Sequence, residues 1–184
     1  PRGARIGLVA LSAHSGGART VARCLERGGF NYRDQIHSGQ GPQGVSEVYL
    51  FDALYGQMRT FRDWLVSSGP MNRNSRMRLA KLVSFYRGGR VERNNNELRR
   101  DLVDEGITCQ LETRGECLSR RAITHGQAVF IESELRHGGM ASRHNNLRDA
   151  LQASCFRARP GYERGGVHGN PWWDRMDECR QIDV

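Results

Sequence analysis

Short apolar runs alternate with amphipathic stretches along this chain. Four runs rich in Val, Ile, Leu, Phe and Tyr predict strands, at residues 6–11, 48–51, 79–86 and 128–135. Four stretches with helical spacing predict helices, at about residues 18–27, 58–67, 95–105 and 145–155. Short apolar runs of this composition are typical of strands that are buried on both faces. The alternation therefore predicts an α/β fold, with a parallel sheet and crossover helices.

The chain has 184 residues, which is enough for one domain with a sizeable hydrophobic core and too few for two such domains. We expect that domain to cover residues 1–156. Residues 157–184 have no clear periodicity and are rich in Gly, Pro and Trp, so we expect an irregular tail packed on the same domain. No run approaches the roughly 18 apolar residues that a membrane helix needs, so we expect no membrane span.

The stretch IGLVALSAHSGGAR, residues 6–19, holds the clearest candidate chemistry. A predicted strand runs into Ser15, Gly16 and Gly17, and a predicted helix follows at once. A nucleophile elbow needs this order, because its turn is strained and small residues must flank the serine. In such a turn Ser15 Oγ stands above the edge of the sheet and the amide of Gly16 can face a developing oxyanion. At this level the chain resembles the α/β-hydrolases, although Ala13 replaces the first glycine of the usual Gly-x-Ser-x-Gly motif.

The same turn has two other interpretations. Gly16 and Gly17 could present backbone N–H groups to a phosphate at a helix N-terminus, with Arg19 in support. The chain would then be a non-catalytic anion-binding module, although it has neither a Gly-x-x-x-x-Gly-Lys nor a Gly-x-Gly-x-x-Gly pattern after this strand. The turn could also be an ordinary structural connection with no ligand.

The resemblance implies a Ser-His-Asp triad, with the three residues in the order Ser, acid, His and each at the carboxyl end of a strand. Asp52 directly follows the run 48–51, and His137 follows the run 128–135. The implied roles are nucleophile for Ser15, base for His137 and orienting carboxylate for Asp52.

Each of the two partners has a rival. Asp52 could instead cap a following helix, and Glu92 is the alternative acid. His144 is the alternative base, near the start of the last predicted helix. His14 could line the cleft, although we expect it to point away from the nucleophile position. We expect the other histidines to be ordinary loop or strand-flank residues, namely His37, His125 and His168.

The position of the elbow adds a further expectation. The α/β-hydrolases place several strands before it, whereas Ser15 is close to the start of this sequence. The resemblance therefore implies the carboxy-terminal portion of a longer hydrolase, lacking the amino-terminal strands, which a second polypeptide would supply together with another oxyanion donor. The implied activity is cleavage of an ester, thioester or amide bond in a small-molecule or acyl substrate, with no cofactor and no metal.

The charge balance is basic, at +8, and all of the 28 basic residues except Lys81 are arginine. They are scattered over every segment, and the aromatic residues do not interleave with them in a stacking pattern. Positive charge alone supplies only non-specific attraction, so we do not expect nucleic acid as the partner.

The five cysteines suggest a compartment. Cys109 and Cys117 bracket a short polar loop that suits a local disulfide, and a second bridge between Cys155 and Cys179 would hold the tail. We expect Cys24 to be a buried small hydrophobe on the inner face of its helix. Two bridges would indicate an oxidising compartment, so we expect a secreted or periplasmic protein. The alternative is a cytoplasmic protein with five reduced thiols. There is no Cys-x-x-Cys pair and no tight His/Cys cluster to suggest a metal.

Overall fold

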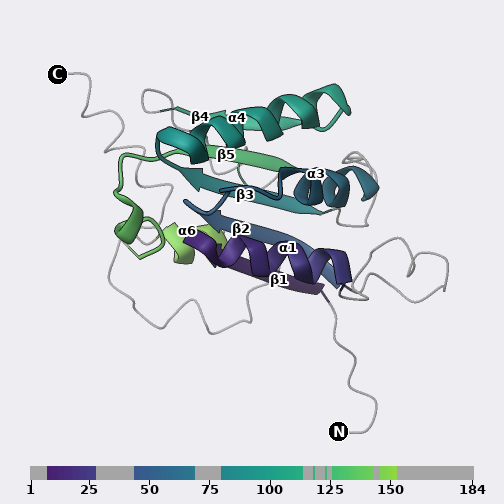
Figure 1. Ribbon diagram of the computed structural model, residues 1–184, viewed down its shortest axis with the longest axis horizontal. Helices are drawn as coiled ribbons and strands as arrows, with labels where there is room; N and C mark the ends of the chain where they lie inside the picture. The colour runs from purple at the N-terminus through teal and green to yellow at the C-terminus, as the bar shows by residue number, and fades with distance from the viewer. Residues whose placement is uncertain are drawn as a thin grey trace, which may run out of the picture.

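The computed structural model describes residues 8–27, 44–68, 80–113, 118, 123, 126–142 and 146–152. Five strands of this part form a parallel sheet in the order β1-β2-β3-β5-β4 (Figure 1). The strands are β1 (Leu8–His14), β2 (Gly44–Phe51), β3 (Lys81–Tyr86), β4 (Cys109–Glu112) and β5 (Ala128–Glu132). The helices are α1 (Ala18–Arg27), α3 (Met58–Ser67), α4 (Gly89–Asp104) and α6 (Asn146–Gln152), with short 3-10 turns η1 (Ser15–Gly17) and η2 (His137–Gly139). The predicted α/β class, with a parallel sheet and crossover helices, is confirmed.

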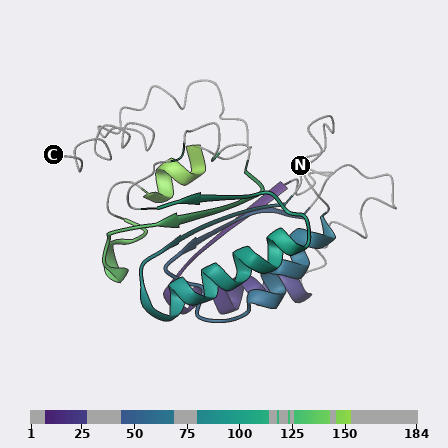
Figure 2. The same ribbon diagram turned by 90° about the horizontal axis from the view of Figure 1, so that it is seen from above.

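The sheet is covered on both faces. Helices α1, α3 and α4 lie on one face and α6 lies on the other (Figure 2). Alternate residues of β2 show the division, because Val48 and Leu50 belong to the core under the three helices, whereas Tyr49 and Phe51 belong to the core on the α6 side. Burial on both faces explains why the strands have continuous apolar runs rather than an alternation of apolar and polar residues.

Helix α1 shows how the amphipathic pattern determines which side chains are buried. Its buried residues lie on one face of the helix, as a period of 3.6 residues requires, and are Ala18, Val21, Ala22 and Leu25. Cys24 lies outside this stripe, and its side chain is exposed. The prediction of a buried Cys24 on the inner face was therefore wrong, since residue 24 is turned by roughly 100° from residue 25 around the helix axis.

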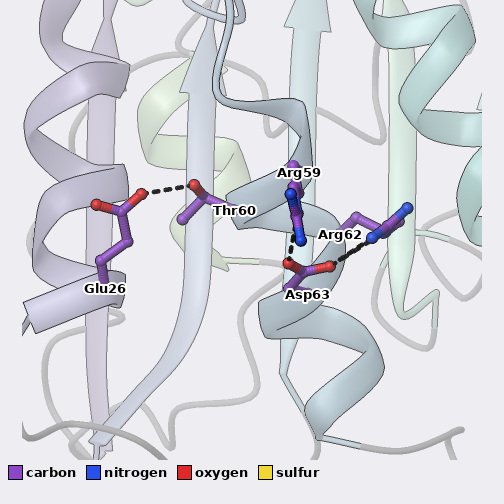
Figure 3. Close-up of polar contacts among 5 residues, drawn as sticks. All are labelled: Glu26, Arg59, Thr60, Arg62 and Asp63. Atoms are coloured by element: carbon purple, nitrogen blue, oxygen red, sulfur yellow. Dashed lines mark hydrogen bonds and ion pairs between the residues drawn. The ribbon is translucent and has the colours of Figure 1, made fainter.

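One polar contact joins helices α1 and α3 on their outer surface, and further ion pairs lie within α3 (Figure 3). Thr60 Oγ1 donates to Glu26 Oε1 at 2.8 Å, and Asp63 forms ion pairs with Arg59 and Arg62 at 3.5 and 2.8 Å. These groups are largely exposed to solvent, so each contact contributes little stability. The apolar stripes beneath them determine how the two helices pack.

Several element boundaries differ from the predicted ones. Helices α1 and α3 have the predicted bounds, but α4 begins six residues earlier than expected, and β5 ends at Glu132 instead of residue 135. Strand β4 was not predicted at all. It has only four residues, in which the polar Gln110 and Glu112 interrupt the apolar pattern, and it lies at the edge of the described sheet. The end of the last predicted helix and the tail at 157–184 lie outside the described residues.

Strand β4 also changes the interpretation of the cysteines. Cys109 is a free thiol at the start of this strand, and its Sγ lies 3.8 Å from the backbone oxygen of Arg99 on α4. Burial raises the pKa of Cys109 to about 11, while the nearby Arg99 guanidinium opposes the shift. The predicted bridge from Cys109 is not seen in the structure, where this residue starts strand β4 beside α4. Cys117, Cys155 and Cys179 lie outside the described residues.

Strand β1 is the other edge of the described sheet, where it pairs with β2 alone. The turn that carries Ser15 therefore follows an edge strand. In the part of the chain that the structure describes, no helix has the length and apolar character that crossing a bilayer demands.

Candidate active site

The candidate residues follow strands whose carboxyl ends lie at one edge of the sheet. His14 is paired with Phe51 across β1 and β2, and these are the last residues of the two strands. Ser15 and Asp52 therefore directly follow two neighbouring strands. Strand β3 separates β2 from β5. The chain after β5 must therefore pass over the end of β3 before His137 can reach Asp52.

Hydrogen bonds hold that connecting segment over the end of β3. The backbone N–H of Ser133 donates to Tyr86 O at 2.8 Å, and the Arg87 guanidinium donates to Glu134 O at 2.5 Å. The backbone N–H of Leu135 donates to Ser133 Oγ at 3.2 Å. These contacts direct residues 133–136 back toward β2 and bring His137, at the start of η2, to the carboxyl edge.

The far side of η2 is fixed as well. Met140, just after η2, is fully buried in the core on the α6 side of the sheet. Its carbonyl oxygen accepts a 2.8 Å hydrogen bond from Asn146 Nδ2 of α6. The His137 turn is thus anchored both before and after the histidine, which restricts where its side chain can lie.

Asp52 and His137 meet at this edge. His137 Nδ1 lies 2.6 Å from Asp52 Oδ2, a short distance for a hydrogen bond that involves a charged group. The Asp52 side chain is buried, while His137 is exposed. Because an ionised carboxylate can only accept, Nδ1 carries the proton in a neutral His137 ring and Nε2 keeps its lone pair. This tautomer is the one that a general base needs.

The backbone around Asp52 explains how the carboxylate is presented. Its N–H donates to Phe85 O at 2.8 Å, and its φ is 46°. Downstream, Asn94 Nδ2 of α4 donates to Leu54 O at 2.8 Å and holds the loop. Helix α3 begins only at Met58, with Gln57 as its N-cap, so the alternative role of Asp52 as a helix cap was wrong.

Ser15 lies in the turn between β1 and α1. Its φ is 56°, in the left-handed region that a non-glycine residue rarely adopts. A sharp strand-to-helix turn imposes strain of this kind on the residue at its corner. Gly16 is exposed, with open space where a Cβ would stand. Among the described residues, no hydrogen bond joins Ser15 Oγ to His137. In enzymes without bound substrate, the hydrogen bond between a nucleophile and its base is often long or poorly aligned.

Two side chains that the sequence did not assign to the site also contact His137. His14 Nε2 donates to His137 O at 2.8 Å, and the two imidazole rings stack with centroids 4.6 Å apart. Tyr55 Oη lies 3.5 Å from His137 Nδ1. Partial burial, together with the Asp52 carboxylate, raises the pKa of Tyr55. Only their positions in the sequence could have pointed to these two residues, since His14 directly precedes Ser15 and Tyr55 follows Asp52 by three residues.

The rival acid, Glu92, does not contact Asp52 or His137 in the described part of the chain. Glu92 lies in the first turn of α4, where its charge helps to raise the pKa of Tyr86. His144 lies outside the described residues, as do His37, His125 and His168. Within the described ranges, no group of three or more His, Cys, Asp or Glu side chains is arranged to hold a metal ion.

Comparison of the chain with protein-family models, with curated proteins and with solved structures finds no match. Any functional conclusion therefore depends on the geometry of Ser15, Asp52 and His137 and on the residues that contact them.

Proposed function

We propose that this protein is a serine hydrolase of the α/β-hydrolase type, with Ser15 as nucleophile, His137 as general base and Asp52 as the orienting carboxylate. The observation that carries the proposal is the 2.6 Å contact between His137 Nδ1 and Asp52 Oδ2. It joins the residue that follows β2 to the first residue of η2, 85 positions away, and a serine with positive φ follows the neighbouring strand β1.

The chemistry follows from these positions. Ser15 Oγ attacks the carbonyl carbon of an ester, thioester or amide, and His137 Nε2 takes the hydroxyl proton. The tetrahedral oxyanion accepts a hydrogen bond from the Gly16 N–H. Collapse of the intermediate breaks the bond to the leaving group, which receives the proton from His137. Water then attacks the acyl-enzyme with His137 again acting as base, and Ser15 is regenerated.

Asp52 stabilises each state in which His137 is positively charged. Its buried carboxylate keeps the proton on Nδ1, and the Asp52 backbone is held by the hydrogen bond from its N–H to Phe85 O. A complete oxyanion hole needs more than one donor. The Gly16 N–H supplies one of these donors.

The alternative of an anion-binding module uses the exposed Gly16 at the start of η1 and α1. It accounts for the glycines but gives no role to the contact between Asp52 and His137. It predicts phosphate binding that survives Ser15→Ala, whereas the hydrolase proposal predicts that this substitution removes the reactive group.

A fluorophosphonate probe tests the proposal directly, because it forms a covalent bond only with an activated serine. The full-length protein, with any polypeptide that copurifies with it, is incubated with the probe and the adduct is mapped by mass spectrometry. We expect one adduct, on Ser15, which is lost in Ser15→Ala and His137→Ala and retained in the control Ser12→Ala. An unlabelled Ser15 in the wild-type protein contradicts the proposal.

A further inference from the structure

His14 connects the nucleophile turn to the base. It is the last residue of β1 and directly precedes Ser15. Its ring stacks on the ring of His137, with centroids 4.6 Å apart and an angle of 29° between the planes. A residue 123 positions away in the sequence is thereby in direct contact with the strand end that carries the serine.

The hydrogen bond between the two residues has a defined direction. A carbonyl oxygen can only accept, so His14 Nε2 donates its proton to His137 O over 2.8 Å. This bond holds the backbone of η2, whereas the stacked rings hold the side chain. His14 therefore restrains His137 at two places.

Asp52 alone does not fix the orientation of the His137 ring. The last side-chain torsion of histidine is broad, and a single hydrogen bond to Nδ1 leaves the ring able to tilt about that contact. Tyr55 approaches the same nitrogen at 3.5 Å and edge-on, so it does not define the ring plane. The stacked His14 ring limits the tilt and therefore the direction of the Nε2 lone pair.

We propose that His14 is a positioning residue that sets the orientation of the His137 imidazole relative to Ser15. This inference rests on the proposed function, because it concerns the alignment of base and nucleophile. Since His14 is covalently bonded to Ser15, a movement of the strand end shifts the nucleophile and the support of the base together. The relative geometry of the two reacting groups is thus preserved.

Three substitutions separate the two contacts. His14→Phe keeps an aromatic ring for stacking and removes the donor to His137 O. His14→Gln keeps an N–H donor and removes the ring, and His14→Ala removes both. His14 is exposed, so we expect all three proteins to fold with the unfolding midpoint of the wild type. Ser12→Ala, an exposed position on the same strand, is the matched control.

The rate of fluorophosphonate labelling of Ser15 is the readout. We expect His14→Ala to slow labelling by about tenfold to a hundredfold, because small misplacements of a base have effects of this size. His14→Phe and His14→Gln should each recover part of the loss. With p-nitrophenyl acetate as substrate, the loss should appear in kcat and not in KM, since His14 aligns the base and does not bind the ester.

The outcomes distinguish this inference from the proposed function. If His14→Ala is labelled at the wild-type rate, the role of His14 is overturned. The proposed hydrolase function still stands in that case, provided that the wild-type protein is labelled and Ser15→Ala is not. Equal losses in all three variants, with a lowered unfolding midpoint, also overturn it, because they indicate a purely structural residue. If His14→Ala fails to fold, the other two variants decide. A wild-type protein without any adduct on Ser15 overturns the proposed function itself.

Discussion

The imidazole of His137 lies against the carboxylate of Asp52, with 2.6 Å between Nδ1 and Oδ2. In the proposed hydrolase, Asp52→Asn leaves a side chain of the same shape but favours the wrong tautomer of His137. We expect kcat for p-nitrophenyl acetate to fall by about 10³- to 10⁴-fold, with a small change in KM. Steady-state kinetics of the purified variant measure both values.

The matched control for that substitution is Asp63→Asn. Asp63 is an exposed carboxylate on α3 that pairs only with arginines of its own helix among its described partners. Its replacement should leave kcat within twofold of the wild type, since exposed pairs of this kind contribute little. Similar activity of the Asp52→Asn and Asp63→Asn variants would remove Asp52 from the mechanism.

Ser15 has a φ of 56°, which predicts that two substitutions differ in their effect on stability but have the same effect on activity. Glycine adopts this conformation without a steric penalty, whereas alanine does not. We expect Ser15→Gly to be more stable than Ser15→Ala by about 1 kcal/mol in the free energy of unfolding, measured with urea. Both variants should lose fluorophosphonate labelling. A more stable alanine variant would show that the turn is not strained at residue 15.

Tyr86, on β3, gives a prediction about alkaline stability. Burial and the neighbouring Glu132 carboxylate raise the pKa of its phenol from 10.0 to about 12, with Arg99 opposing. The unfolded chain therefore ionises first as pH rises. The stability associated with the neutral phenol is complete below pH 10 and is lost between pH 10 and about 12.

Tyr86→Phe removes this titration and keeps the ring. We expect the unfolding free energy of the variant to fall less steeply than that of the wild type between pH 10 and 12, as measured by urea unfolding at each pH. Parallel pH curves for the wild type and Tyr86→Phe would contradict the prediction.

The two described cysteines should differ in reactivity. Cys24 is exposed on α1, whereas the Cys109 thiol is partly buried and burial raises its pKa to about 11. Because the thiolate is the reacting form, we expect iodoacetamide at pH 8 to modify Cys109 about 100-fold more slowly than Cys24. Timed alkylation followed by peptide mapping measures the two rates.

Unfolding is the control for this comparison. In guanidinium chloride both thiols are solvated and should react at similar rates. If the rates also agree in the native protein, Cys109 is not protected by β4 and α4. A disulfide-linked peptide containing Cys109 in a non-reducing digest would contradict the free thiol directly.

Much of the fold could be predicted from local patterns. The amphipathic spacing of α1 and α3 gave their bounds, because apolar residues at intervals of three and four positions produce one buried face. Strand β4 could not be found in this way, because its four residues mix polar and apolar side chains and its pairing with β5 is a long-range contact. The start of α4 was placed too late because its first two turns contain a glycine and mostly polar residues, with Val91 as their one apolar side chain.

The sequence by itself determined the alternation of strands and helices, the small residues around Ser15, and the order of serine, acid and histidine at the ends of apolar runs. These features are local, so they depend only on neighbouring residues. The tertiary structure decided that the chain after β5 crosses the end of β3, that Asp52 contacts His137 instead of capping a helix, and that His14 stacks on the same imidazole. Such contacts join residues 85 and 123 positions apart, and strand order and packing, which no local pattern encodes, bring them together.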